Sequence, residues 1–208
     1  MMPFGRVKIR VLLVLSSRPD PLCNSGVQLV WRSMGRCWCL VLIRIRLCGK
    51  KLLLNTIKVN VDGAIFAEEH KYGFGCVACG ANGRLIEAIS SSQLGIVGPE
   101  IAEVIGVKET LSWIKRKGWM EVEIETDALV VVQAVMGSIQ MPSQFGFLVQ
   151  DCRNLLSCIN HVSLHFVKRS ANRATYCVAR ASCYHSDRIF CEQDAPLELM
   201  SIVDVECL

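Results

Sequence analysis

The sequence predicts an α/β domain over residues 55–185, with elements in the order βββαβααβα and three antiparallel strands first. Apolar and polar residues alternate along 57–62, which is typical of a half-buried strand. Asn82-Gly83 is a strong hairpin turn, and it joins a strand over 72–80 to one over 84–92. Pro99 at a first helical position and Gly118 just past the end delimit a long helix between them.

The remaining elements follow from similar signals. Strands are expected over 121–126 and 161–168, and helices over 128–136, 144–157 and 172–184. In the long helix Gly106 and Thr110 share a face with Glu103, and such small residues would let that face lie against the sheet. Asp127 precedes a helix and could cap it.

Both ends of the chain lack clear periodic elements. Residues 1–50 carry nine Lys/Arg against one Asp, a net charge of +8, so the rest of the chain is net −4. We expect 1–54 to be a basic, poorly ordered extension in which 41–47 would permit one strand, and 186–208 to be a tail without elements. Because the body is acidic, any nucleic-acid groove needs locally clustered basic residues.

Composition favours a globular protein, since 51% of the residues are hydrophobic and 20% are charged. No apolar run approaches the roughly 20 residues of a membrane span, so we expect no membrane association. The twelve cysteines are scattered. Cys76 and Cys79 would point to opposite faces of one strand, which argues against a shared zinc and for buried or incidental reduced thiols. We expect an intracellular protein of the nucleus or cytoplasm, with organelle targeting by the basic N-terminus as a weak alternative.

Three acidic residues stand at structurally important places. Asp62 closes the first alternating strand, Glu103 lies in the first turns of the long helix, and Asp127 sits where a strand gives way to a helix. Magnesium takes oxygen ligands and usually few of them from protein. Three carboxylates brought together would therefore suit a metal-dependent nuclease. For Asp62 the alternative is a solvated strand end, for Glu103 a solvated helix face, and for Asp127 a helix cap; Glu109, Glu123 and Glu125 are interpreted as surface charges.

The order of elements, together with five motifs, resembles the plant ribonuclease H-like domain family, which has the type 1 ribonuclease H fold and is related to non-LTR retrotransposon reverse transcriptases. The motifs are Lys58–Ala64 (KVNVDGA), Gly73–Val77 (GFGCV), Ala102-Glu103, Glu123–Ala128 (EIETDA) and Phe166–Arg173 (FVKRSANR). The resemblance covers about residues 55–185. It implies a five-stranded mixed sheet flanked by helices.

The resemblance also implies cleavage of the RNA strand of RNA–DNA hybrids with two Mg²⁺ ions. Asp62, Glu103 and Asp127 match the first three metal-binding carboxylates of the family. Tyr176 falls where the fourth is expected, so we expect the second metal site to be weakened. The His-bearing loop of bacterial enzymes is shortened to Arg169–Ala171.

Substrate contacts are expected from Asn60, on the same strand face as Asp62, and from the basic cluster near the site, which contains Lys168, Arg169, Asn172 and Arg173. The ordinary alternative for this cluster is a solvated turn. We expect a monomeric endonuclease that acts on RNA–DNA hybrids or other nucleic acid without a small-molecule cofactor. Two alternatives stay open: a domesticated module that binds nucleic acid or a protein partner with little turnover, and a decayed transposon fragment.

Overall fold

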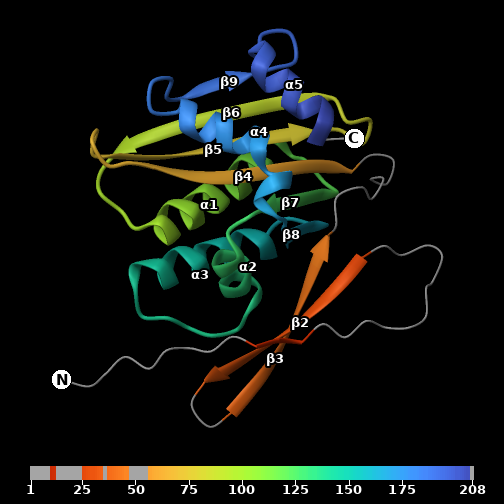
Figure 1. Cartoon of the computed structure of the whole chain (residues 1–208), viewed down its shortest axis with the longest axis vertical. Coiled ribbons are helices and arrows are strands. Elements are labelled where there is room, and N and C mark those ends of the chain that lie inside the picture. The colour runs from red at the N-terminus through yellow and green to blue at the C-terminus, as the bar shows by residue number, and fades with distance from the viewer. Residues whose placement is uncertain (1–9, 13–24, 35–36, 47–55, 207–208) are drawn as a thin grey trace.

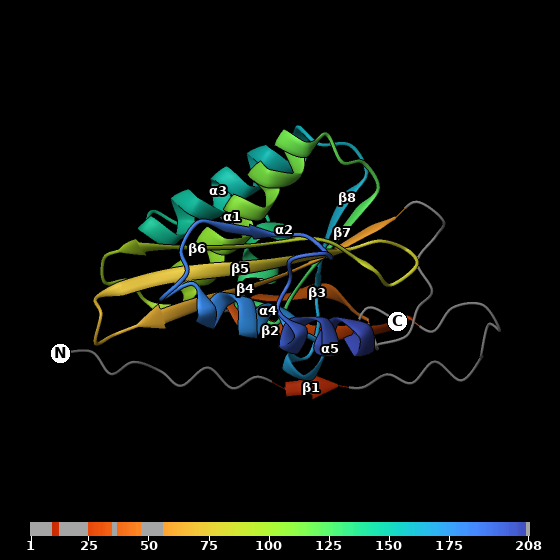
Figure 2. The same ribbon diagram turned by 90° about the horizontal axis from the view of Figure 1, so that it is seen from above.

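The computed structural model describes residues 10–12, 25–34, 37–46 and 56–206. Its centre is one mixed β-sheet with helices on both faces (Figures 1 and 2). Helices α1, α2 and α3 lie on one face and α4 and α5 on the other, as the view from above shows. No helix among these residues is long and apolar enough to cross a membrane.

The first three strands of the expected domain form an antiparallel meander. β4 (Ile57–Phe66) pairs with β5 (Lys71–Cys79), which pairs with β6 (Leu85–Leu94). The predicted turn at Asn82-Gly83 connects the second pair, and Gly83 has a φ of 78°, which glycine adopts without steric cost. The antiparallel arrangement predicted from the sequence is therefore confirmed.

Two parallel strands complete the five that were predicted. β7 (Val122–Thr126) pairs in parallel with β4, and β8 (Val162–Phe166) pairs in parallel with β7. The pairing of β4 with β7 ends at Val61 and Thr126, whereas β4 continues beside β5 as far as Phe66. From Asp62 onward β4 is therefore no longer paired with β7, and the two strands separate at this point.

Four predicted helices are present. They are α1 (Pro99–Lys117), α2 (Leu129–Met136), α3 (Gln144–Ser157) and α4 (Arg173–Ala181), the last preceded by a short 3-10 turn, η1 (Arg169–Ala171). α1 ends at Gly118, whose φ of 65° closes the helix in a left-handed conformation. The main hydrophobic core lies between the sheet and α1, α2 and α3. The order βββαβααβα is confirmed.

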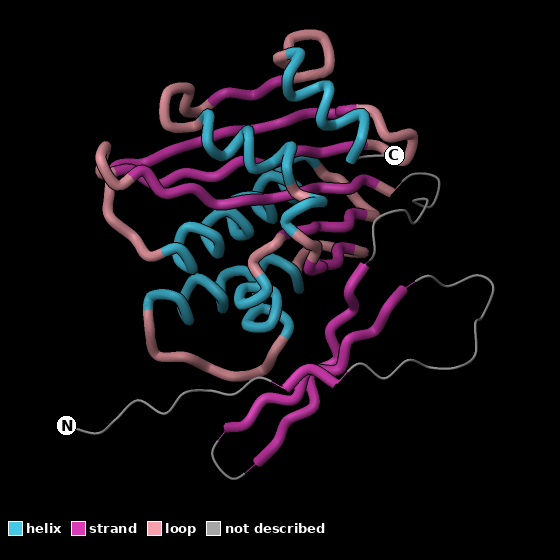
Figure 3. The backbone as a smooth tube through the Cα atoms, in the orientation of Figure 1, coloured by secondary structure: helices cyan, strands magenta, loops and turns pink. Residues whose placement is uncertain are grey.

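The sheet extends beyond the five expected strands at both edges. Among the described residues it has nine, because β1 (Arg10–Leu12), β2 (Ser25–Met34) and β3 (Cys37–Arg46) join one edge and β9 (Arg188–Phe190) the other. Figure 3 shows the β2–β3 hairpin reaching away from the helices, and β3 pairs with β8 at Ile45 and Phe166. The one strand that the sequence permits, over 41–47, overlaps β3, whereas β1 and β2 were not expected. The poor order expected for 1–54 stays a prediction. β2 shows little of the alternation that predicts a strand, whereas Arg44 and Arg46 alternate with apolar residues in β3. The rest of 1–54 lies outside the described residues.

The C-terminal tail also carries an unpredicted helix, α5 (Leu197–Glu206). Leu199 and Val203 of this helix are buried in a second core with Val77, Leu85 and Val178 of β5, β6 and α4. The expectation of a tail without elements is therefore wrong. β9 is too short for a periodic signal, and α5 is not segregated into one apolar and one polar face by its sequence.

The two cysteines of β5 lie on opposite faces of the sheet, as predicted. Cys76 belongs to the main core and Cys79 to the second core beneath α5. The Cys76 thiol is free, and its Sγ lies 2.8 Å from the Thr110 hydroxyl oxygen. Cys79 is disulfide-bonded, whereas a reduced thiol was expected. The pair does not form one metal site.

Candidate metal centre

Asp62 lies on β4 at the point where the strand loses its neighbour β7. The strand was expected to close at this residue but continues to Phe66, because Gly63-Ala64 forms part of the strand and no turn. The Asp62 residue is only 3% exposed. A carboxylate this deeply buried requires a partner that offsets its lost hydration.

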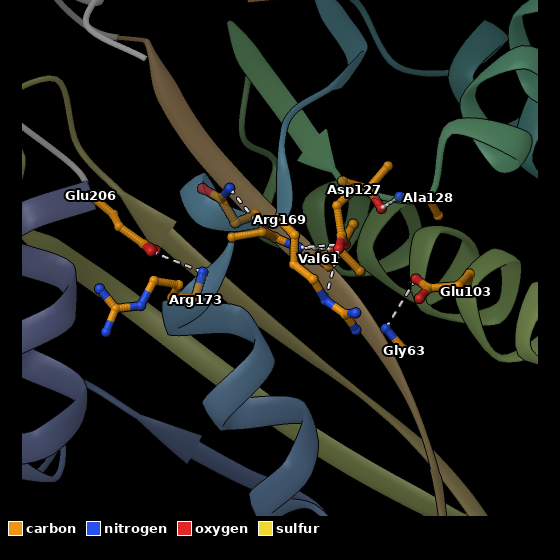
Figure 4. A network of polar contacts seen from close by, with 11 residues as sticks. Val61, Gly63, Glu103, Asp127, Ala128, Arg169, Arg173 and Glu206 are labelled. Atoms are coloured by element: carbon orange, nitrogen blue, oxygen red, sulfur yellow. Dashed lines mark hydrogen bonds and ion pairs between the residues drawn. The ribbon is translucent and has the colours of Figure 1, made fainter. Parts of the chain in front are cut away.

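Glu103 reaches Asp62 because α1 crosses very close to β4. A Cβ atom on Gly63 would lie 2.9 Å from the backbone of Glu103, and one on Gly106 would lie 3.2 Å from Val61 Cγ2. A side chain at Gly63 would displace the α1 backbone, and one at Gly106 would require Val61 to shift, which agrees with the prediction that small residues seat this helix face on the sheet. The Gly63 backbone N–H donates to Glu103 Oε2 over 3.1 Å (Figure 4).

Asp127 follows β7 directly and reaches the same place from the other side. Its predicted role as a helix cap is wrong, because α2 begins at Leu129 and its N-terminus receives no side-chain cap. The Thr126 hydroxyl oxygen accepts a hydrogen bond from the Ala128 N–H instead, over 3.1 Å (Figure 4). The Asp127 carboxylate is thereby left for the site.

The three carboxylates form one cluster. Each offers an oxygen, and these oxygens lie within 4.8 Å of one another. Burial, and after it the charge of Asp127, raises the pKa of Asp62 to about 7. Burial and the charges of both aspartates raise the pKa of Glu103 to about 8. Acidic oxygens held this close repel one another, and a divalent cation between them would relieve that repulsion.

A buried amide network lies directly beneath the cluster. Asn172 Nδ2 donates to Asp127 Oδ1 and to the Val61 carbonyl, each over 3.1 Å. Asn60 Nδ2 lies 3.1 Å from Asn172 Oδ1 and 3.3 Å from Glu125 Oε2. Asn60, Glu125 and Asn172 are all less than 10% exposed. The network fixes Asp127 relative to β4.

This network changes three expectations from the sequence. Asn60 and Asn172 were predicted to contact substrate, but their side chains are enclosed among protein groups, so they support the site from beneath. Glu125 was interpreted as a surface charge and is instead 6% exposed and an acceptor for Asn60. Glu125 precedes Asp127 by two residues, as Asn60 precedes Asp62, so strand alternation places each pair on one face of the sheet. This pattern could have revealed the role of Glu125.

The predicted basic residues are exposed, and one of them, Arg169, contacts the cluster. Lys168, Arg169 and Arg173 are all exposed. Arg169 Nε lies 3.6 Å from Asp127 Oδ2, and the Arg169 side chain is 78% exposed (Figure 4). The Asp127 side chain is 15% exposed, so only the guanidinium of this pair faces water, and it is accessible to an anionic ligand.

Tyr176 lies one turn into α4, beside Arg169. The Arg169 guanidinium carbon is 5.7 Å from the centre of the Tyr176 ring, and Tyr176 is 44% exposed. Among the described residues, the group of acidic, His and Cys side chains that could hold a metal contains Asp62, Glu103 and Asp127 and no fourth member. That Tyr176 takes the place of the fourth carboxylate stays a prediction.

Glu206, at the end of α5, was not anticipated as part of this region. Its two carboxylate oxygens accept hydrogen bonds from the backbone N–H groups of Arg173 and Ala174, over 2.9 and 3.0 Å (Figure 4). Lys58 of β4 donates to the Glu206 carbonyl over 2.8 Å. The last turn of α5 therefore caps α4 and ties it to the strand that carries Asp62.

Comparison with known proteins agrees with this architecture. The family model described as reverse transcriptase-like matches residues 60–182, more than half of the chain. The chain therefore belongs to this family, which comprises ribonuclease H-like domains related to retroelements. No curated protein matches the chain.

Several solved structures share the fold. Ribonuclease H1 from the halophilic archaeon Halobacterium salinarum is 17% identical with a TM-score of 0.57, covering 63% of this chain and 99% of that one. The N-terminal ribonuclease H domain of a Mycobacterium tuberculosis protein is 18% identical with a TM-score of 0.54, covering 61% and 92%. LC11 ribonuclease H1 in complex with an RNA/DNA hybrid is 16% identical with a TM-score of 0.54, covering 61% and 96%. At these identities the likeness establishes the ribonuclease H-like fold alone.

Proposed function

We propose that this protein is a Mg²⁺-dependent endonuclease that hydrolyses the RNA strand of RNA–DNA hybrids, leaving 3′-hydroxyl and 5′-phosphate ends. The observation that carries the proposal is the cluster of Asp62, Glu103 and Asp127, whose oxygens lie within 4.8 Å of one another. The crystallised relative bound to an RNA/DNA hybrid supports the choice of substrate.

The donor set fits a divalent cation. All three ligands are carboxylates, the donors that hard ions such as Mg²⁺ select, and two of them have pKa values raised by burial and mutual repulsion. A bound magnesium ion supplies a water molecule of lowered pKa and neutralises charge on the phosphate. The carboxylates of Asp62, Glu103 and Asp127 would hold it, while Asn172 keeps Asp127 in position.

Substrate positioning would fall to the exposed basic residues. Lys168, Arg169 and Arg173 stand in sequence around η1, next to Asp127. Arg169 pairs with Asp127 at 3.6 Å through a guanidinium that is itself exposed to water, so it can exchange this partner for a substrate phosphate. Discrimination of RNA from DNA requires a contact to the 2′-hydroxyl.

A second function is favoured by Tyr176. A neutral phenol adds no charge to hold a second ion, and two-metal hydrolysis needs both the attacking and the leaving oxygen stabilised. The alternative is a module that binds nucleic acid or a protein partner and turns over little. Such a module would retain the fold and the basic cluster but would hydrolyse nucleic acid slowly or not at all.

Cleavage of end-labelled duplexes by purified protein separates these functions. The substrates are an RNA–DNA hybrid and RNA–RNA and DNA–DNA duplexes of the same sequence, each with and without Mg²⁺. Cleavage of the hybrid RNA strand alone, dependent on Mg²⁺, supports the endonuclease. Binding of the hybrid without cleavage at any Mg²⁺ concentration would replace it with the binding module.

A further inference from the structure

The outward face of α4 carries arginine and tyrosine side chains in a helical repeat. Arg173, Tyr176 and Arg180 are spaced by three and four residues, which places them along one side of α4, and Arg169 precedes the helix in η1. All four are exposed. The inward positions Ala174, Thr175, Val178 and Ala179 are buried against the sheet.

Tyr184 continues this side of the helix beyond its last full turn. Its backbone N–H donates to the Ala181 carbonyl over 3.2 Å, so the chain keeps turning there, and the residue is 79% exposed. A tyrosine this exposed contributes nothing to a core, and its ring is accessible to a partner. We call Arg169, Arg173, Tyr176, Arg180 and Tyr184 the α4 stripe.

Along the sequence, the charged residues of the segment that contains the α4 stripe are all basic. Between Asp151 and Asp187 the sequence contains no Asp or Glu, but it contains Arg153, Lys168 and the three arginines of the stripe. This segment is the local basic cluster that an otherwise acidic body needs in order to hold a polyanion. The tyrosine rings among these arginines point to a further type of contact. Binding to the phosphates of a duplex requires only cations, so the exposed rings suggest a ligand whose bases are unpaired.

The α4 stripe begins at the metal centre. Arg169 lies 3.6 Å from Asp127 and stands over the Tyr176 ring at 5.7 Å, so one guanidinium links the carboxylate cluster to the first tyrosine. Farther along, Arg180 lies over the Phe66 ring at 4.9 Å and donates to the Ile65 carbonyl. Arg180 is thus held against β4, whereas the exposed Arg169 guanidinium can exchange its partner.

We propose that the α4 stripe binds a single-stranded nucleic-acid segment that continues from the hybrid held at the metal centre. Arginines would contact its phosphates, and unpaired bases would stack on Tyr176 and Tyr184. At the rise of an α-helix, the stretch from Arg173 to Tyr184 would span about 16 Å, the length of about five nucleotides. This inference rests on the proposed function and specifies it: the preferred substrate is a junction of hybrid and single strand.

Binding measurements can test the junction separately from the chemistry. The probe is a fluorescent RNA–DNA hybrid, either blunt or with an overhang of about six nucleotides at one or the other end. The full chain carries Asp62→Asn so that the probe stays intact during anisotropy titrations. An overhang at one end is expected to tighten binding at least about fivefold, the effect of one stacked base.

Variants of the α4 stripe identify the binding surface. Tyr184→Ala should remove most of the overhang's effect without changing affinity for the blunt hybrid, and Tyr184→Trp should restore it because the indole also stacks. Since Tyr184 is 79% exposed, these changes leave the fold intact. Arg180→Ala should also lower the salt dependence of overhang binding by about one counterion. Lys115→Ala with Arg116→Ala, exposed on α1 at the other face of the sheet, is the matched control and should change neither affinity.

The outcomes separate the inference from the proposed function. If the blunt hybrid binds but no overhang tightens binding, or if Tyr184→Ala keeps the full gain, the inference is overturned and the endonuclease proposal stands. If the blunt hybrid does not bind at all, the proposed function fails first. A gain that Lys115→Ala with Arg116→Ala abolishes would place the single strand on α1 and also overturn the inference.

Discussion

The Asn172 amide nitrogen lies 3.1 Å from Oδ1 of Asp127 and 3.1 Å from the carbonyl oxygen of Val61. Asn172 directly precedes α4, and its buried side chain connects the start of this helix to the Asp127 carboxylate and to β4, the strand that carries Asp62. Groups that orient a metal ligand commonly change metal affinity by 10- to 100-fold when removed. Asn172 is therefore a positioning residue of the proposed site.

Asn172→Ala should weaken Mg²⁺ binding about tenfold, because Asp127 loses the donor that holds it. It should also lower the free energy of unfolding by about 1–3 kcal/mol, since Asn60 and Val61 lose a buried partner. Mg²⁺ titrations by calorimetry and urea unfolding measure the two effects. Asn154→Ala, on the outer surface of α3, is the control. An unchanged Mg²⁺ affinity in Asn172→Ala would remove its positioning role.

Tyr176→Asp should raise hybrid cleavage and lower the Mg²⁺ concentration needed for it, because a carboxylate one turn into α4 adds the missing negative charge. Rates on a blunt hybrid across a Mg²⁺ titration measure this. Tyr184→Asp, farther along the same side of the chain, should bring no such gain, and adding Asp62→Asn to Tyr176→Asp should abolish activity. If the wild-type protein is already fully active at low Mg²⁺ and Tyr176→Asp changes nothing, another residue completes the site.

The raised pKa values of Asp62 and Glu103 predict how stability depends on pH without metal. Their unfolded values are near 3.8 and 4.5, and the folded values are about 7 and about 8. Between these limits the folded protein binds more protons than the unfolded chain, so stability falls as pH rises and levels off above about 8. A cation replaces those protons. Mg²⁺ should therefore raise the melting temperature more at about pH 8.5 than at about pH 5; equal shifts would contradict the raised pKa values.

Asp62→Asn gives a further test of the same electrostatics. It removes a buried charge that the other two carboxylates repel, so the metal-free variant should be more stable than wild type at about pH 8.5. Near pH 5, where the wild-type carboxyl is protonated, the two proteins should unfold at similar temperatures. Mg²⁺ should stabilise the variant much less than wild type. Thermal unfolding followed by circular dichroism measures all three, and a variant less stable at high pH would contradict the repulsion.

Glu206→Ala should destabilise the protein by about 1 kcal/mol, because two N–H groups at the start of α4 lose their acceptor next to Asn172. Glu206→Gln keeps an acceptor and should recover part of this. Glu198→Ala, exposed at the other end of α5, should have no effect. Urea unfolding compares the three, and equal stability of Glu206→Ala and wild type would show that the cap is dispensable.

A fragment of residues 56–206 should fold without the first 55 residues, since both cores are formed within it. The shorter fragment 55–185 lacks Leu199 and Val203 and would expose the apolar surface of β5, β6 and α4 that they cover. We expect it to unfold at lower temperature. Circular dichroism of both fragments checks this, and an unfolded 56–206 fragment beside a folded full-length chain would show that the N-terminal strands are required.

Local chemistry explains what could be predicted from the sequence. α1 and α3 begin and end where expected. Pro99 and Gly118 start and end α1, and Ser143 caps the start of α3, through contacts with residues close by in the sequence. The Ser143 side chain accepts a hydrogen bond from the Gly146 N–H at the start of α3. The cluster of Asp62, Glu103 and Asp127 was predicted because each stands at a recognisable place in a regular element.

Long-range packing explains what could not be predicted. Asp62 was placed at a strand end because Gly63 resembles a turn residue, but this glycine makes room for α1. Glu125 accepts a hydrogen bond from Asn60, 65 residues away along the chain, and Glu206 accepts one from the Arg173 N–H, 33 residues away. No local sequence pattern indicates such partners. Short segments such as β9, with three residues, carry no period.

The central claim is that the three-carboxylate cluster is a metal-dependent nuclease site. Its most direct test is the rate of hybrid cleavage across a Mg²⁺ titration for the wild-type protein and Asp62→Asn, both purified identically and shown to be folded. We predict that wild type cleaves the RNA strand in a Mg²⁺-dependent manner and that Asp62→Asn, which nearly preserves shape while removing the buried ligand charge, does not. Equal cleavage by the two proteins would contradict the claim.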